Sequence, residues 1–283
     1  MNNLNFWIMK KTLLFIISLL FILPSAFSSD KFMSDEIAFK GGERATYHIY
    51  FNLGPIWLHA GNVNFSVKER VDKNVPLFDL QLAGSTIKSF DRFYCIRDTF
   101  SVTVQQKGLL PLYYKEVKHE DSYFSDKRYR FDWKENDKGS KVYFDFNKRG
   151  KMSYDSLPIQ RGVLDLITSC YHIRSVDMKK VKKGQMIPFR LVLDKEIYDL
   201  TVKCCGEETI KLKNKKKYKA LKFTPKLVTG DIFEEEDAMS IYVSNDENHV
   251  PLYIEAKIKV GYVKVMLNDI SNTKYPMSSV VSK

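Results

Sequence analysis

One stretch of the sequence combines charged and aromatic side chains in a way that suits ligand binding. Residues 89–98 read SFDRFYCIRD, so that paired charges alternate with aromatic rings. Phe93 and Tyr94 are candidates for the apolar wall of a cavity, since burying such rings and a ligand's tail together removes apolar surface from water. Arg97 is the candidate for its polar mouth, because a guanidinium holds an anionic head group through two parallel hydrogen bonds.

The same stretch also has a structural interpretation. We expect it on a central strand, where Asp91, Arg97 and Asp98 must pair with one another if they point inward, because an unpaired buried charge is costly. Residues 123–133 also combine aromatic and basic side chains. A structural ion network and the polar end of a ligand cavity both remain open at this point.

Other kinds of site find little support. The histidines at 48, 59, 119, 172 and 249 include no pair spaced i, i+4, so a helix-borne zinc site is not indicated. No Gly-x-Ser-x-Gly elbow and no phosphate-binding glycine loop occur. Residues 234–237 and 245–248 are rich in oxygen ligands but lack the spacing of a calcium loop, and we interpret them as charged hairpin tips. We expect no catalytic residue, metal or cofactor.

The chain is basic, with a formal net charge of +11 at pH 7. Such a charge favours acidic partners, but the lysines are spread along the chain, and a nucleic-acid binder more often clusters arginines among stacking aromatics. We therefore expect no nucleic acid as a partner. The lysine-rich run at 213–219 joins two candidate strands and is interpreted as a solvated hairpin tip. The alternative is peripheral docking on an anionic membrane, at about 1 kcal/mol per basic residue.

Four cysteines, Cys95, Cys170, Cys204 and Cys205, allow up to two disulfides in three full pairings. Neighbouring residues on a strand point to opposite faces, so Cys204 and Cys205 are not expected to pair on one face. Their spacing matches no zinc site. The pairing stays open.

The elements that would position these residues are mostly strands. Apolar and polar residues alternate with period two in many short runs, separated by turns rich in Gly, Asn and Pro, which predicts about a dozen antiparallel strands. The clearest runs lie at 47–51, 63–67, 142–146, 200–204, 253–258 and 263–267. The expected fold is mainly β: a large curved antiparallel meander, an open or partly closed barrel, wrapped around one amphipathic helix.

That helix is predicted at about 159–174. Apolar residues fall at 159, 163, 166, 167, 170 and 171, a single helical stripe, and Ser156 before Pro158 is a plausible start signal. We expect the stripe to pack against the inner face of the sheet. Leu166→Ala should then be costly, whereas Asp165, on another face, should tolerate alanine.

The N-terminus has the layout of a secretory signal peptide. Lys10 and Lys11 precede an apolar run of 11 residues at 13–23, and Ala26 and Ser28 supply the small residues of a cleavage site. The run is too short to span a bilayer. We predict a signal peptide at 1–28, one mostly-β domain at 29–270 and a frayed tail at 271–283. The mature chain is expected outside the cytoplasm, periplasmic or otherwise extracytoplasmic, soluble and without a transmembrane span.

Several motifs together resemble an exported bacterial family catalogued as domain of unknown function 3108. The match extends over about residues 37–268, and only the lysines at 215–217, where a Gly-containing turn is usual, depart from it. The motifs that carry the resemblance are Phe39-x-x-Gly42-Glu43-x-x-x-Tyr47, Ala60-Gly61, Phe93-Tyr94-x-x-Arg97-Asp98-Thr99-Phe100, Leu110 to Tyr114, Asp155 to Pro158, Gly206-Glu207-Glu208-x-Ile210 and Val243 to Leu252.

The resemblance implies an exported, mainly antiparallel β protein and carries over no catalytic residue. Because barrel mouths commonly bind ligands, the leading hypothesis is non-catalytic binding of an amphipathic, lipid-like ligand between sheet and helix. The first alternative is a structural or assembly partner of an envelope protein, through an exposed sheet edge. The second is an uncharacterised hydrolase.

Overall fold

The computed structural model describes residues 32, 34, 36–53, 56–226, 237–258 and 261–282. The predicted signal peptide at 1–28 lies outside these residues, and so does all of the acidic run at 234–237 except Asp237. Within the described part, no helix has both the length and the hydropathy needed to cross a bilayer.

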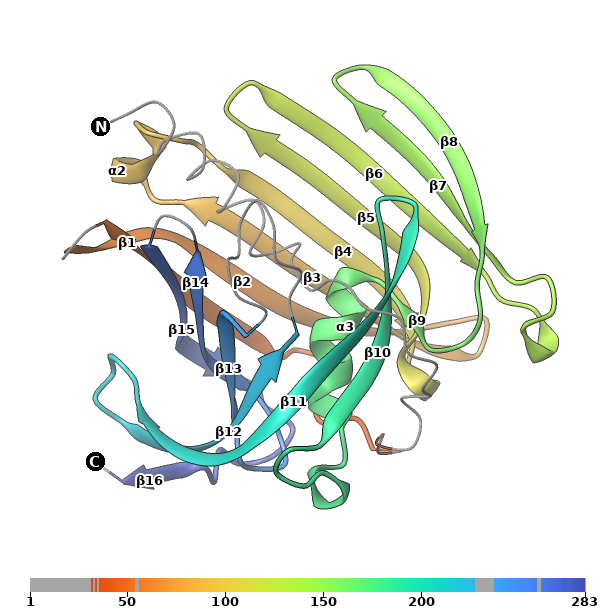
Figure 1. Cartoon of the computed structure of the whole chain (residues 1–283). Helices are drawn as coiled ribbons and strands as arrows, with labels where there is room; N and C mark the ends of the chain where they lie inside the picture. The colour runs from red at the N-terminus through yellow and green to blue at the C-terminus, as the bar shows by residue number, and fades with distance from the viewer. Residues whose placement is uncertain are drawn as a thin grey trace.

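Strands dominate the molecule, and they form one large curved sheet (Figure 1). The sheet is not closed, and the prediction of a mainly β, open meander is confirmed. In chain order the strands are β1 (Arg44–Leu53), β2 (Ile56–Asp72), β3 (Val75–Thr86), β4 (Arg97–Gln105), β5 (Leu110–Glu120), β6 (Tyr123–Asp132), β7 (Lys141–Lys148), β8 (Lys151–Pro158), β9 (Val163–Leu164), β10 (Met186–Leu193), β11 (Glu196–Lys211), β12 (Lys217–Pro225), β13 (Met239–Ser244), β14 (Pro251–Ile258), β15 (Gly261–Ser271) and β16 (Val280–Ser282).

The sheet consists of two meanders joined side by side. β1 to β8 pair consecutively, β10 to β15 do the same, and β1 pairs antiparallel with β15 to connect the two halves. Only the short β9 pairs in parallel, with β10, among the described strands. Side chains alternate between the two faces of each strand, so the inner face collects the apolar half of every alternating run predicted from the sequence.

Side chains rather than a strand ladder hold the two ends of the curved sheet together. The turn between β10 and β11 reaches across to β6 and β8 (Figure 1). There the Asp194 carboxylate meets Lys127 Nζ at 2.5 Å, the Asp194 N–H donates to the Tyr129 hydroxyl, and Lys195 Nζ lies 3.6 Å from Asp155. The result is barrel-like without a continuous ring of hydrogen bonds.

The helix inside the sheet is shorter than predicted. α3 spans Leu166–His172 and continues as a 3₁₀ turn at Ile173–Ser175, in place of a helix over 159–174. The stripe begins on extended chain, because β8 runs to Pro158 and Gly162 has φ +88°, which a right-handed helix does not allow.

Asp165, not Ser156, caps this helix. Its carboxylate accepts from the backbone N–H of Ile167 at 2.9 Å and of Thr168 at 3.0 Å, which are two donors that have no partner within the helix. The expectation that Asp165 lies on a tolerant face was wrong, since the residue is completely buried. Burial raises the pKa of its carboxyl to about 6, against the opposing effect of these hydrogen bonds.

The charged and aromatic stretch 89–98 is not a central strand. It contains the one-turn helix α2 (Lys88–Asp91), followed by a turn, and β4 starts only at Arg97. Within the described residues the other short helices are 3₁₀ turns at Lys107–Leu109, Glu135–Asp137 and Met178–Lys180.

The C-terminal tail is also different from the prediction of fraying. β16 pairs with β12, and the backbone of Tyr275 exchanges two hydrogen bonds with the side chain of Asn248. Residues 271–282 therefore form part of the folded structure.

Candidate functional site

An apolar cavity of about 200 Å³ lies between α3 and the inner face of the sheet, and it is partly open to solvent. Apolar cavities of about 150 Å³ are large enough to stay dry and to bind small apolar molecules. Its main apolar lining comes from Ala45, Tyr47 and Ile49 of β1, Val63 and Phe65 of β2, Leu166, Cys170 and Tyr171 of α3, Val202 of β11, Ile241 of β13, Ile254 of β14 and Val265 of β15.

A row of aliphatic side chains forms the sheet side of this cavity. Ile49, Val265, Ile254 and Ile241 stand in register on four neighbouring strands, β1, β15, β14 and β13. Ile49 is buried, but the other three are only half-buried although they are apolar and face the interior. Apolar side chains that remain partly uncovered inside a curved sheet are what a lipid-like tail would cover.

The helix supplies the opposite side. Leu166, Cys170 and Tyr171 project from α3 toward the cavity. Burial raises the pKa of the Cys170 thiol to about 12. A thiol in this state is a poor nucleophile, because the thiolate is the reactive form. These three side chains contribute apolar surface to the cavity.

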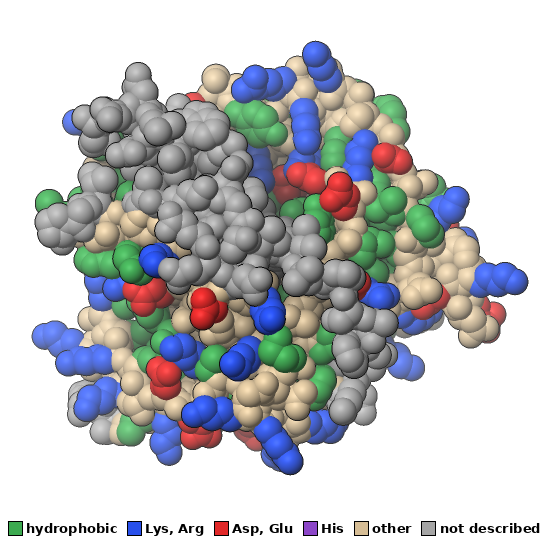
Figure 2. Space-filling model, in the orientation of Figure 1, with side chains coloured by type: hydrophobic (Ala, Val, Ile, Leu, Met, Phe, Trp, Pro, Cys, Tyr) green, Lys and Arg blue, Asp and Glu red, His purple; other side chains and the backbone are tan. Residues whose placement is uncertain are grey.

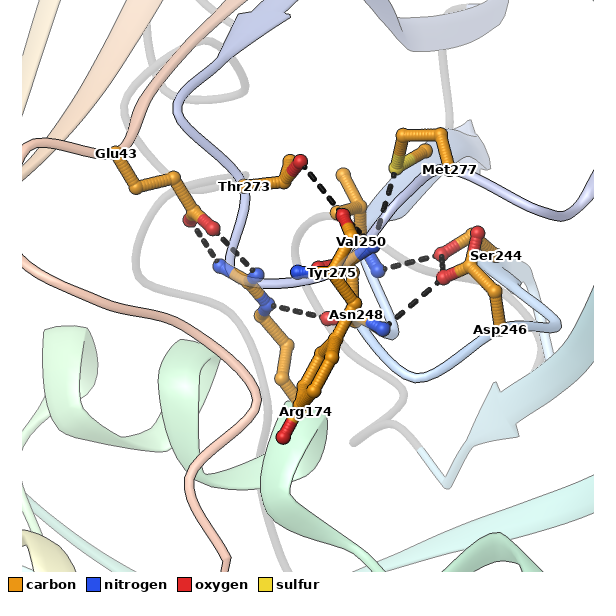
Figure 3. Close-up of polar contacts among 9 residues, drawn as sticks. All are labelled: Glu43, Arg174, Ser244, Asp246, Asn248, Val250, Thr273, Tyr275 and Met277. Atoms are coloured by element: carbon orange, nitrogen blue, oxygen red, sulfur yellow. Dashed lines mark hydrogen bonds and ion pairs between the residues drawn. The ribbon is translucent and has the colours of Figure 1, made fainter.

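A buried ion pair forms the polar end of the cavity wall (Figure 3). The Arg174 guanidinium donates to both Glu43 oxygens, at 2.5 and 3.0 Å, and its Nε donates to the Asn248 carbonyl at 3.1 Å. Both charged side chains are more than nine-tenths buried. The guanidinium also lies over the rings of Phe39 and Tyr171, at 5.4 and 5.6 Å from their centroids. The charges at this end of the cavity neutralise each other.

The turn between β13 and β14 holds this ion pair in place (Figure 3). Asp246 accepts from the Ser244 hydroxyl at 2.8 Å and from the Asn248 N–H at 3.1 Å. Asn248 is fully buried and binds both Arg174 and the C-terminal tail. The polar residues at 245–248, interpreted from sequence as an exposed charged tip, thus include a structural link between helix, turn and tail.

The three residues selected from the sequence do not line the cavity. Phe93 is half exposed, with 51% of its surface accessible, and packs against Phe90 with ring centroids 6.0 Å apart. Tyr94 is buried and donates to Glu120 at 3.2 Å. Arg97 forms a two-pronged pair with Asp91, at 2.7 and 3.1 Å, and donates to the Thr86 hydroxyl at 3.1 Å. The structural interpretation of Arg97 with Asp91 therefore fits the geometry.

Asp98 points inward as expected, but into a different cluster. Its carboxylate accepts from the His119 N–H at 3.1 Å, and Glu120 and Lys118 of β5 are its charged neighbours. Burial, and next the nearby Glu120, raise the pKa of Asp98 to about 8. Burial also raises the pKa of Glu120. Paired carboxyl groups of this kind share a proton at neutral pH.

This carboxyl pair predicts an unusual pH dependence of stability. The native state binds more protons than the unfolded chain between about pH 4, where an unfolded Asp titrates, and about pH 8. The Asp98 contribution is fully present below that window and is lost as pH rises through it. Asp98→Asn keeps a neutral side chain at every pH. The free energy of unfolding of this variant minus that of the unmodified chain should therefore increase from pH 5 to pH 8. Urea unfolding at several pH values tests this; parallel curves for the two chains would contradict it.

The four cysteines are all free thiols in the structure. Cys204 is buried, and the strand bulges between Cys204 and Gly206, so that the Cys205 sulfur lies 3.4 Å from the Thr224 hydroxyl. Among the described residues no group of three His, Cys, Asp or Glu side chains is placed to hold a metal ion.

Sequence reasoning missed Glu43 and Arg174. Glu43 follows Gly42, which has φ +89°, just before β1, and it entered the sequence analysis only as part of a family motif without a role. The partners lie 131 residues apart, and no local pattern marks a long-range pair of this kind. The aliphatic lining, in contrast, lies largely on alternating runs that were predicted as strands.

Comparison with known proteins gives a family and a fold. A family model described as "Protein of unknown function (DUF3108)" matches residues 46–268. No curated protein matches. A crystal structure of a β-barrel-like protein of the domain of unknown function DUF1849 from Brucella abortus is similar, with a TM-score of 0.53 and 8% identity, over 85% of this chain and 100% of that one. At such low identity the likeness concerns the fold alone.

The family model begins in β1 and ends in β15, so it contains both meanders of the sheet, α3 and nearly all of the cavity wall. The protein belongs to the family of proteins of unknown function DUF3108.

Proposed function

We propose that the protein binds an amphipathic ligand without transforming it, and that the cavity between α3 and the sheet takes up the ligand's apolar part. The observation that carries this proposal is the uncovered aliphatic row of Val265, Ile254 and Ile241 inside the curved sheet. Each CH₂ group transferred from water to such a surface contributes about 0.8 kcal/mol. The ligand's polar head would stay at the open side.

The polar end of the cavity limits the choice of ligand. Glu43 and Arg174 already satisfy each other, so a charged group brought against them would have to displace a buried pair. An uncharged acyl or similar chain enters without that cost. Burial raises the pKa of the Cys170 thiol, so this lining residue offers no reactive thiolate. The setting we propose is extracytoplasmic, on the basis of the sequence at 1–28.

A variant that fills the cavity tests this function. Ile254→Trp places a larger side chain into the half-buried row, and in the chain from Ser29 it should weaken binding of a single-chain lysophospholipid probe at least tenfold while leaving the urea midpoint nearly unchanged. Val71→Trp is the matched control, because Val71 is 67% exposed on β2 and is not among the lining residues. Calorimetric titration measures both. Equal affinity of Ile254→Trp and the unmodified chain would exclude the cavity as the binding site.

A second candidate function, assembly with another envelope protein, is favoured by β8. This strand ends the sheet and, among the strands that the structure describes, pairs with β7 alone. It exposes Met152 and Tyr154, with 52% and 68% of their surfaces accessible. An unpaired edge with apolar side chains can accept a strand from a partner.

A further inference from the structure

Apolar side chains gather on the outside of the molecule where two hairpins end. Ile56, Trp57 and Leu58 open β2, directly after the β1–β2 turn, and Tyr262 opens β15, after the β14–β15 turn. All four are exposed, Ile56 most of all at 59%. The side chains of Ile56 and Leu58 point to one face of the strand and Trp57 to the other, so both faces of this hairpin end are apolar.

The two hairpin ends lie side by side. Asn52 of β1 pairs with Trp57, and the Gly261 backbone packs so closely on Asn52 that an added Cβ would be 2.7 Å from its carbonyl oxygen. They lie at the left of Figure 1, with the turn between β11 and β12 below them. The apolar residues therefore form one continuous tip.

Three lysines lie beside this tip. Lys264 Nζ lies 3.9 Å from the centroid of the Trp57 ring, and Lys213 Nζ, in the β11–β12 turn, lies 3.5 Å from that of Tyr50. Together with Lys211 they line an outer groove of about 450 Å³. Lys264 also meets Glu255 at 3.4 Å, but Lys211 and Lys213 form no ion pair within the described part of the chain. On the face shown in Figure 2, Lys and Arg are interspersed with acidic side chains.

His48 of β1 lies near Lys213 of this groove. The His48 ring packs at a tilt against His59, with ring centroids 4.6 Å apart, and shares a hydrogen bond of 3.3 Å with the Tyr50 hydroxyl. Partial burial, then His59 and Lys213, lower the pKa of His48. A bound anion would relieve this repulsion.

We infer that this tip, defined as Ile56, Trp57, Leu58 and Tyr262 with Lys211, Lys213 and Lys264, docks on the surface of an anionic lipid bilayer. Trp and Tyr prefer the interfacial zone of a bilayer, where an apolar ring and a polar edge are both satisfied. Apolar side chains on both faces of a hairpin end, aliphatic on one and aromatic on the other, suit shallow insertion rather than packing on a flat protein surface. Lysines just behind the tip would meet the anionic head groups.

Vesicle flotation of the chain from Ser29 tests the inference, with vesicles of phosphatidylcholine alone or mixed with phosphatidylglycerol. We expect binding to the anionic vesicles only, weakened by salt. Ile56→Ser and Trp57→Ser should abolish detectable binding, and Lys213→Gln should weaken it about fivefold, the equivalent of about 1 kcal/mol. Tyr154→Ser, which changes a residue 68% exposed on β8, is the control and should bind as the unmodified chain does.

Tryptophan fluorescence gives an independent reading. Trp57 and Trp133 are the tryptophans of residues 29–283, and Trp133 donates from its ring to the Pro111 carbonyl, far along the sheet on β5. In a Trp133→Phe chain the emission of Trp57 should shift to shorter wavelength on adding anionic vesicles.

Three results would overturn the inference. They are equal binding to both kinds of vesicle, binding that survives Ile56→Ser and Trp57→Ser, and self-association through the tip in the absence of lipid, which would assign this surface to a second copy of the chain. Ile254→Trp should leave vesicle binding intact, so failure of the cavity proposal and failure of this one are distinguishable.

Discussion

Arg174→Met should destabilise the protein by about 3–5 kcal/mol, because it leaves the Glu43 carboxylate buried without its partner. The substitution also removes the hydrogen bond to the Asn248 carbonyl, which connects helix, turn and tail. Urea unfolding measures the loss as a lower midpoint. The slope of the transition should be unchanged if the native fold is retained.

The double variant Glu43→Leu/Arg174→Met tests whether the lost stability comes from the Glu43 carboxylate that is buried without a partner. Removing both charges at once replaces an ion pair with apolar side chains, which is often close to neutral. We expect the double variant to recover most of the lost stability. Arg97→Gln is the surface comparison, since Arg97 and Asp91 are paired where solvent reaches them, and it should change stability far less. A cost for Arg174→Met no larger than that of Arg97→Gln would contradict this account of the cavity wall.

Ile167→Ala should cost about 2–5 kcal/mol, the second large effect that we expect. Ile167 lies on α3, is fully buried in the main core, and belongs to a helix of seven residues that is too short to be stable on its own. Packing against β3, β4 and β10 therefore has to hold it in place. Differential scanning calorimetry or urea unfolding measures the change.

Two further substitutions on the same segment serve as comparisons for Ile167→Ala. Cys170→Ala removes a half-buried side chain that borders the cavity, and it should cost little. Asp165→Ala removes the helix cap and should cost about 0.5–2 kcal/mol, in contrast to what the sequence pattern suggested. If Ile167→Ala and Cys170→Ala had equal effects, α3 would not be packed as described.

Patterns that repeat along the chain predicted most of the fold. Alternation identified the strands, since most inward side chains of a curved sheet are apolar, and the runs at 253–258 and 263–267 lie within β14 and β15. The apolar stripe predicted at 159–171 is helical only in its second half, from Leu166 on. Ile159 and Val163 are buried as the stripe requires, but they lie outside the helix, on either side of Gly162, with Val163 on β9. Burial spacing alone does not distinguish a helix from a strand followed by a turn.

Contacts between distant parts of the chain could not be predicted. Arg97 and Arg174 are both arginines beside aromatic residues, and only the folded structure shows which one borders the cavity. The tail gives a second example, because Ser271 to Ser282 looks like a terminal polar segment until Asn248 and β12 provide its partners. Charged residues that pair across many strands carry no local signature.

Native mass spectrometry of the chain purified from its own cells tests the central claim most directly. We predict that the intact protein carries an additional noncovalent mass, that organic extraction recovers this mass as an amphipathic molecule, and that the Ile254→Trp protein purified in parallel lacks it. Bare protein in both preparations, or the same bound mass on the Ile254→Trp protein, would contradict the claim that this cavity binds a ligand.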